Sequence, residues 1–179
     1  MRNRHIVITF GLILLSSGFW ISCRQGETGE VLTSSKEQKT PKDSPYIQGN
    51  QKILHWETEE IELFIKRYGW QMQRTGTGLY IQILKPGNGE LFKEGDEVRL
   101  SYKTFLLDGQ MIYSSEEEGD KIFKVARSEE IDGLHEAAQL LRPGARARLV
   151  IPSYMAYGVA GDGNKINGRL AIAMEVNVE

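Results

Sequence analysis

Three stretches in the C-terminal half of the chain alternate apolar with polar residues, and this alternation is the strongest constraint on the fold. They cover residues 98–106, 145–151 and 170–178. In a β-strand every second side chain points to the same face, so each stretch predicts a strand with one buried face and one polar face. Strands of this kind belong to antiparallel sheets. We therefore predict one antiparallel sheet in this half of the chain.

A short helix is predicted between the first two of these strands. Small and apolar residues recur there at helical spacing, at Leu134, Ala137, Ala138 and Leu141. The segment 142–144, Arg-Pro-Gly, ends the helix. Asp108-Gly109, directly after the first strand, is a hairpin turn signal. One short helix laid across an antiparallel sheet is an α+β fold.

A separate helix is predicted ahead of the sheet, from Thr58 to Gly69. Acidic residues at its start and basic residues at its end suit the helix dipole, and Gly69 supplies the left-handed stop. Its apolar side chains fall on one face: Ile61, Phe64, Ile65 and Tyr68. We interpret this face as packing on the domain, and a partner protein is the alternative.

The first 22 residues have the layout of a secretory signal peptide, with a basic start followed by an apolar run from Ile6 to Ile21. Cys23 follows directly and is the only cysteine, so it cannot form an internal disulfide. Its position resembles a bacterial lipobox, which implies a lipid anchor on Cys23. We expect an envelope protein whose membrane-anchored domain faces the periplasm. An uncleaved membrane-spanning anchor is the alternative, because the apolar run is at the lower limit for a spanning helix.

Residues 23–51 are rich in Glu, Lys, Ser, Thr, Gly and Pro and carry few apolar side chains. Such a segment cannot offset its own ordering entropy, so we predict a disordered tether, with a partner-binding tail as the alternative. The chain then divides into a signal peptide (1–22), the tether (23–51), a helix with its lead-in (52–77) and the sheet domain (78–179).

The composition argues against several classes of function. A net charge of −2 gives no general attraction to phosphate, so no nucleic-acid partner is expected. The histidines are His5, His55 and His135, and no free cysteine remains to pair with them after lipidation. A zinc site or a Cys/His nucleophile is therefore not expected, and neither is a cofactor.

A series of short motifs follows the start of the first strand in this order: Tyr102, Leu107-Asp108-Gly109, Tyr113-Ser114-Ser115, Phe123, Ile131-Asp132-Gly133-Leu134, Arg142-Pro143-Gly144, Ile151-Pro152 and Ala156-Tyr157-Gly158. In order and spacing the series resembles the FKBP family of peptidyl-prolyl cis/trans isomerases, over residues 78–179. The resemblance implies an FKBP-like curved antiparallel sheet wrapped around one short α-helix, here preceded by an extra N-terminal helix. It also implies an isomerase that assists the folding of exported proteins.

A narrower resemblance comes from three features together: the lipobox, the leading helix and the phrase at 133–137, Gly-Leu-His-Glu-Ala. They are similar to the gliding-motility-associated lipoprotein isomerases of Bacteroidota. The implied partners are proline-containing exported clients and components of a gliding machinery. A non-catalytic module that binds proline-containing segments is the alternative function.

The family resemblance also assigns the site. The apolar walls of the pocket fall on Tyr102, Ile112, Phe123, Val125, Ile131, Ile166 and Ile172, with Leu134 as the floor. The backbone N–H of Ile131 and the phenol of Tyr157 are expected to hold substrate carbonyl oxygens. Without the resemblance, Tyr102, Phe123 and Ile172 would be interpreted as ordinary core residues, and Asp162 as a solvated turn residue.

Three site residues depart from the family pattern. Tyr113 stands where the family usually has an Asp, Leu134 replaces the common Trp floor, and Ile112 replaces a Phe. We expect a smaller apolar floor, altered preference for the residues beside proline, weaker macrolide binding and reduced activity. Rotation about an X-Pro bond needs no nucleophile, so the loss of the Asp does not remove the chemistry.

Overall fold

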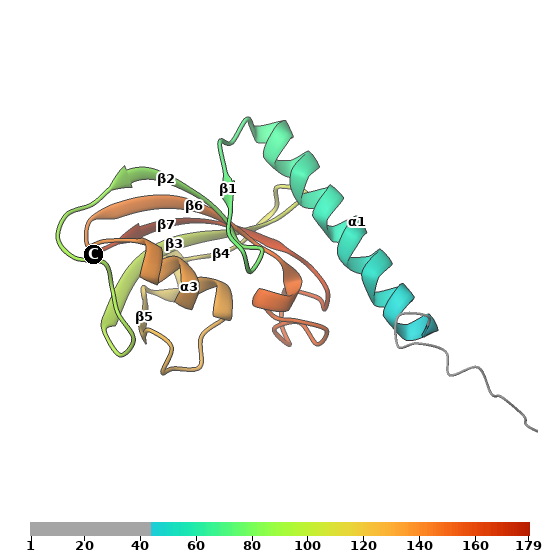
Figure 1. The fold of residues 1–179 in the computed structure, drawn as a ribbon. Helices are drawn as coiled ribbons and strands as arrows, with labels where there is room; N and C mark the ends of the chain where they lie inside the picture. The colour runs from blue at the N-terminus through green and yellow to red at the C-terminus, as the bar shows by residue number, and fades with distance from the viewer. Residues whose placement is uncertain (1–43) are drawn as a thin grey trace, which may run out of the picture. The chain divides into compact units, whose positions relative to one another are not determined.

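The alternating stretches form the centre of an antiparallel sheet in the computed structural model, which describes residues 44–179 (Figure 1). Within these residues the sheet has seven strands: β1 (Gln73–Arg74), β2 (Tyr80–Pro86), β3 (Glu97–Leu106), β4 (Met111–Ser114), β5 (Lys121–Lys124), β6 (Ala145–Ile151) and β7 (Ile172–Val178). Their order is β1-β2-β6-β7-β3-β4, and β5 pairs with β3. Every pairing is antiparallel, which confirms the predicted sheet.

Two of the predicted strands match β3 and β6 closely, whereas the third begins later than predicted. β7 starts at Ile172 instead of Leu170. Ile172 lies opposite both Leu106, the last residue of β3, and Ile151, the last residue of β6, so no strand extends far enough to pair with Leu170. Asp108-Gly109 lies in the turn between β3 and β4, as predicted.

The curved sheet wraps around α3 (Asp132–Leu140), the predicted short helix (Figure 1). Leu134, Ala137 and Ala138 of this helix are buried in the main apolar core with the inward side chains of the sheet. The approach is closest at Gly133, where an added Cβ atom would collide with the side chain of Ile151 on β6. The predicted α+β architecture is thus confirmed.

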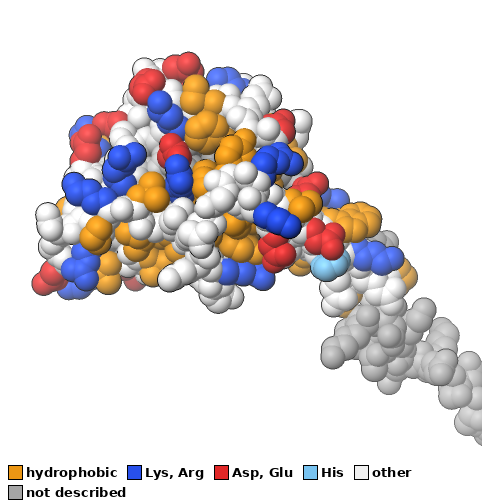
Figure 2. Space-filling model, turned by 90° about the horizontal axis from the view of Figure 1, so that it is seen from above, with side chains coloured by type: hydrophobic (Ala, Val, Ile, Leu, Met, Phe, Trp, Pro, Cys, Tyr) orange, Lys and Arg blue, Asp and Glu red, His pale blue; other side chains and the backbone are white. Residues whose placement is uncertain are grey.

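The opposite face of the sheet is covered by α1 (Pro45–Tyr68). Ile61 and Phe64 of α1 form a second buried cluster with outward side chains of the sheet, among them Val150 and Ala173. The predicted packing of this helix on the domain is therefore correct. Trp56, nearer the start of α1, is exposed. Apolar side chains lie among acidic and basic ones on the surface of this part of the molecule (Figure 2).

The start of α1 corrects two predictions. The helix begins at Pro45 instead of Thr58, so residues 45–51, assigned to the disordered tether of 23–51, are helical. Proline at the first helical position has its backbone preset for a helix, and once a helix is nucleated each further polar residue adds a hydrogen bond. The apolar stripe used for the prediction marks only the part of α1 that packs on the sheet. Residues 1–43, with Cys23, lie outside the described residues.

The end of α1 agrees with the prediction. Gly69 has a φ of +63°, in the left-handed region, and its N–H bonds to the carbonyl oxygen of Lys66. Residues 44–179 contain two further short helical segments: α2 (Ser115–Glu118) after β4 and the 3-10 turn η2 (Ser153–Met155) after β6. In residues 44–179 no helix combines the length and the apolar character needed to cross a membrane.

Gly49 in α1 and Gly133 in α3 provide a paired test of the fold. Gly133→Ala should lower the free energy of unfolding by about 1–3 kcal/mol, because the new methyl group overpacks the contact with Ile151. Gly49→Ala meets no atom within 4 Å. It should stabilise the chain by up to about 1 kcal/mol through the higher helix propensity of alanine. Urea denaturation measures both changes, and similar effects at the two positions would contradict the packing of α3.

Candidate active site

The structure brings the nine candidate pocket residues together. They belong to one apolar cluster although they come from β3, β4, β5, α3, β7 and the loops between them: Tyr102, Ile112, Tyr113, Phe123, Ile131, Leu134, Tyr157, Ile166 and Ile172. Tyr113, Ile131 and Tyr157 are partly buried and reach the surface, and the other six are buried. The cluster therefore has an apolar interior with three accessible residues at its edge, while a role in catalysis stays a prediction.

The phenol of Tyr157 is a neutral hydrogen-bond donor over the physiological pH range. Burial, and then the negative charges of Glu130 and Asp162, raise the pKa of Tyr157 to about 12. Within residues 44–179 no protein group is hydrogen-bonded to its hydroxyl. This hydroxyl can therefore donate to a carbonyl oxygen brought in by a ligand.

The backbone N–H of Ile131, the second predicted carbonyl donor, is already occupied. It donates to Oε1 of Glu130 at 3.0 Å. The other oxygen of the Glu130 side chain accepts from Nζ of Lys121 at 2.7 Å, and this ammonium group lies 5.3 Å from the ring centroid of Tyr102. A substrate carbonyl must displace Glu130 before it can bond to Ile131. The sequence analysis did not predict the ion pair of Lys121 and Glu130, because neither residue is part of a periodic apolar pattern.

Tyr113 and Asp162 form a second polar pair at the edge of the cluster. The Tyr113 hydroxyl donates to Oδ2 of Asp162 at 2.5 Å, and Oδ1 accepts from the N–H groups of Asn164 and Ile166. Burial raises the pKa of Asp162, but these hydrogen bonds outweigh it and the net pKa is lowered. Asp162 is thus a partly exposed turn residue, as interpreted from the sequence, and its carboxylate also orders the loop that positions Ile166.

His135 serves the structure of the site. Its Nδ1 accepts the N–H of Ala126 at 3.0 Å, which leaves Nε2 to donate to the carbonyl oxygen of Ser128 at 3.1 Å. The ring packs edge-on against Phe123, with centroids 5.3 Å apart. Both ring nitrogens are hydrogen-bonded to backbone groups, so His135 is not available for proton transfer. In residues 44–179 no cluster of three or more His, Cys, Asp or Glu side chains could hold a metal ion.

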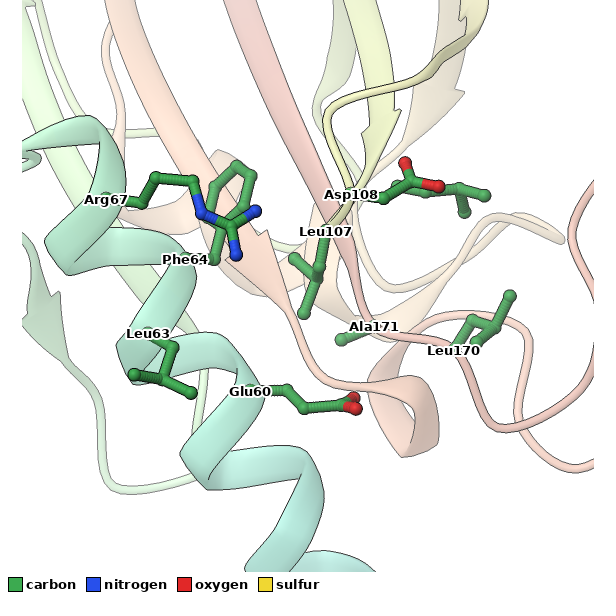
Figure 3. A pocket seen from close by; sticks show the side chains of 9 residues that line it. Glu60, Leu63, Phe64, Arg67, Leu107, Asp108, Leu170 and Ala171 are labelled. Carbon is green, nitrogen blue, oxygen red and sulfur yellow. The ribbon is translucent and has the colours of Figure 1, made fainter.

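A separate hollow lies between α1 and the β3–β4 hairpin (Figure 3). It has a volume of about 540 Å³ and shares no residue with the nine of the apolar cluster. Leu63 and Phe64 of α1 lie across it from Leu107 and Ala171, with Glu60 and other charged side chains around them (Figure 3). This groove is therefore separate from the candidate site around Tyr157.

The comparison with protein families decides the family of the chain. Residues 89–179 match the model of the FKBP-type peptidyl-prolyl cis-trans isomerases. The chain belongs to this family. The match begins somewhat later than the predicted domain of residues 78–179, and α1 lies outside it.

Individual FKBP relatives agree with the family assignment. The chain is 33% identical over 129 residues to the isomerase FkpA of Escherichia coli, and 32% identical over 122 residues to a probable FkpA of Neisseria meningitidis. These alignments cover 72% and 67% of this chain but 44% of each relative, so the chain spans less than half of their length.

Solved structures show the same fold. The crystal structure of Escherichia coli FkpA superposes with a TM-score of 0.61 at 27% identity, and covers 74% of this chain and 62% of that one. An isomerase from Pseudomonas syringae gives a TM-score of 0.58 at 26% identity, with coverage of 76% and 95%. The FKBP-like fold predicted from the sequence is confirmed.

Removal of the Glu130 carboxylate should strengthen peptide binding by this FKBP site. Glu130→Ala frees the Ile131 N–H, so we expect the Kd for a proline-containing peptide to fall about threefold or more, since one competing hydrogen bond is lost. Titration calorimetry measures the Kd. Glu129→Ala removes the same charge from the exposed neighbouring residue and serves as the control. Equal effects of the two substitutions would show that charge alone, and not the bond to Ile131, matters.

Proposed function

We propose that this chain is a peptidyl-prolyl cis/trans isomerase that assists the folding of exported proteins. The observation that carries the proposal is the neutral phenol of Tyr157 at the edge of the main apolar core, which contains the nine candidate residues, in a chain of the FKBP family. An X-Pro bond interconverts in tens to hundreds of seconds without catalysis, which makes it a slow step in folding. A site that lowers this barrier would therefore speed the folding of exported chains that contain proline.

The geometry supports catalysis without a nucleophile. The planar amide is dipolar, and the twisted transition state has lost that charge separation, so an apolar wall favours the twisted form. In this proposal Phe123 and Ile172 are the walls and Leu134 is the floor, and all three belong to the buried apolar core. The Tyr157 hydroxyl, and the Ile131 N–H once Glu130 has moved, orient the substrate carbonyl groups. The side chains of this site need no change of ionisation during the reaction.

A non-catalytic module that binds proline-containing segments is the second candidate. The hydrogen bond from Ile131 to Glu130 favours it, because the substrate carbonyl must compete with a charged acceptor in the chain itself. The two functions differ in turnover. A protease-coupled assay of a proline peptide with the full chain should show acceleration above the uncatalysed rate, and binding without acceleration would leave the module as the function.

Tyr157→Phe tests the phenol without removal of the ring. We expect kcat/KM to fall about threefold to tenfold, the effect of one lost hydrogen bond. Tyr68→Phe, on α1 and outside the apolar cluster, is the matched control and should keep the wild-type value. A Tyr157→Phe variant with unchanged kcat/KM would remove the phenol from the mechanism.

The pH profile follows from the raised pKa of Tyr157. Because this pKa is about 12, the Tyr157 hydroxyl is fully protonated between about pH 6 and pH 8, and kcat/KM should be constant over that range. His135→Gln should leave the chemical step nearly intact, although it weakens the loop that His135 holds. A step in the profile near the pKa of histidine, lost in His135→Gln, would assign a titrating role to His135 and overturn this mechanism.

Phe123→Ala tests the apolar wall. It should lower kcat/KM at least about tenfold, or 1.4 kcal/mol of transition-state stabilisation. Loss of a buried aromatic also destabilises a fold by roughly 3–5 kcal/mol, so circular dichroism must first show that the variant is folded. Full activity of a folded Phe123→Ala would contradict the apolar mechanism.

We further propose that the chain is a lipoprotein of the cell envelope, anchored through Cys23, with its domain facing the periplasm. The position of Cys23 directly after the apolar run supports this proposal. The finer proposal is a member of the gliding-associated lipoprotein isomerases, with gliding components as partners beside exported clients. A fatty-acid analogue should label the wild-type chain in cells and not Cys23→Ala. Equal labelling of both would contradict lipidation.

A further inference from the structure

A buried carboxylate of α1 contacts the loop that carries Tyr157. Oε1 of Glu57 accepts the backbone N–H of Ser153 at 2.6 Å, across 96 residues of sequence. Glu57 is 7% exposed and Ser153 is 8% exposed. An N–H bond to an ionised carboxylate is stronger than one between neutral groups. The helix is thereby attached to η2, the turn at the start of this loop, which follows β6 in Figure 1.

Ser153 transmits this attachment to the residues beside Tyr157. Its carbonyl oxygen accepts the N–H of Ala156 at 3.1 Å and the N–H of Gly158 at 2.7 Å. These two residues precede and follow Tyr157 directly. The carbonyl oxygen of Tyr157 accepts in turn from the N–H of Gly161 at 3.1 Å. The position of the phenol therefore depends on where Ser153 is held.

Apolar packing does not explain a glutamate at position 57. The next residues on the same face of α1, Ile61 and Phe64, are apolar and buried against the sheet. A buried carboxylate is destabilising unless hydrogen bonds replace its water. Within residues 44–179, Oε2 of Glu57 has no hydrogen-bond partner. The Glu57 side chain is therefore hydrogen-bonded to this part of the protein through Oε1 and the Ser153 N–H alone.

We propose that Glu57 is a positioning residue for Tyr157, and that α1 is therefore a working part of the site. The proposal rests on the isomerase function proposed above. Glu57 does not touch the substrate and acts only through Ser153. The family match of residues 89–179 does not include α1, so this chain uses an element from outside the matched region to hold its catalytic loop.

Two substitutions in the full chain separate the hydrogen bond from the charge. Glu57→Gln keeps an oxygen that can accept the Ser153 N–H, whereas Glu57→Leu keeps a similar volume and removes the acceptor. We expect kcat/KM to fall about fivefold or more in Glu57→Leu, mainly in kcat, and to stay within about twofold in Glu57→Gln. Glu59→Leu, on the exposed side of α1, is the matched control and should keep the wild-type value.

Amide hydrogen exchange tests the position of the loop without any activity. The N–H groups of Ala156 and Gly158 should exchange about tenfold faster or more in Glu57→Leu than in Glu59→Leu. Both donate to the carbonyl oxygen of Ser153, and Glu57→Leu removes the hydrogen bond that fixes Ser153. If Glu57→Leu does not fold, Ser153→Pro deletes the donor instead. Position 153 is the first residue of η2, where proline is tolerated.

The outcomes separate this proposal from the proposed function. Unchanged exchange at Ala156 and Gly158 in folded Glu57→Leu or Ser153→Pro overturns the role of Glu57, whatever the activity. Unchanged kcat/KM in Glu57→Leu, beside an active wild type, overturns it as well. Faster exchange in a chain whose wild type has no isomerase activity supports the attachment of the loop and overturns only the isomerase function.

Discussion

The central strand β7 is paired on both sides, and its side chains alternate between two cores. Met174 and Val176 point toward the core that contains α3, whereas Ala173 points toward the cluster under α1. The small side chain of Ala173 leaves room for Phe64 on the outer face. Because a strand has a period of two, this one segment determines where both helices lie. The shape of the inner core, and with it the floor of the site, follows from this arrangement.

The candidate site lies where the ordered sheet ends and its loops begin. Leu134 and Ile172 belong to the rigid core, and Tyr157 and Ile131 lie at its edge. A loop can present such groups accurately only when its backbone is held in place. Hydrogen bonds do this here: Glu57, from the distant helix α1, holds the start of the Tyr157 loop, and Asp162 holds Ile166 from within the same loop.

The charged side chains of the candidate site hold loops in place and compete with a ligand for hydrogen-bond donors, whereas the proposed bond rotation itself needs no charged group. Lys121 and Glu130 neutralise each other beside Tyr102, and Glu130 occupies the Ile131 donor. In the proposed function, a substrate would exchange one hydrogen bond for another at Ile131, with a smaller net gain than from a free donor. The raised pKa of Tyr157 keeps the remaining donor protonated. Apolar contact is left as the main source of selectivity for the twisted amide.

The sequence by itself determined three of the seven described strands (β3, β6 and most of β7), the short helix α3, the hairpin turn and the FKBP family, because each depends on local period or on motif order. It also named nine candidate site residues, and the fold collects them into the main apolar core. The start of α1 could not be predicted, since its first residues carry no apolar stripe. The bonds of Glu57 to Ser153 and of Tyr113 to Asp162 join residues far apart in the chain, and no pattern within a segment encodes them. Only tertiary structure brings such partners within hydrogen-bonding distance, and burial further strengthens the bond of Glu57 to Ser153.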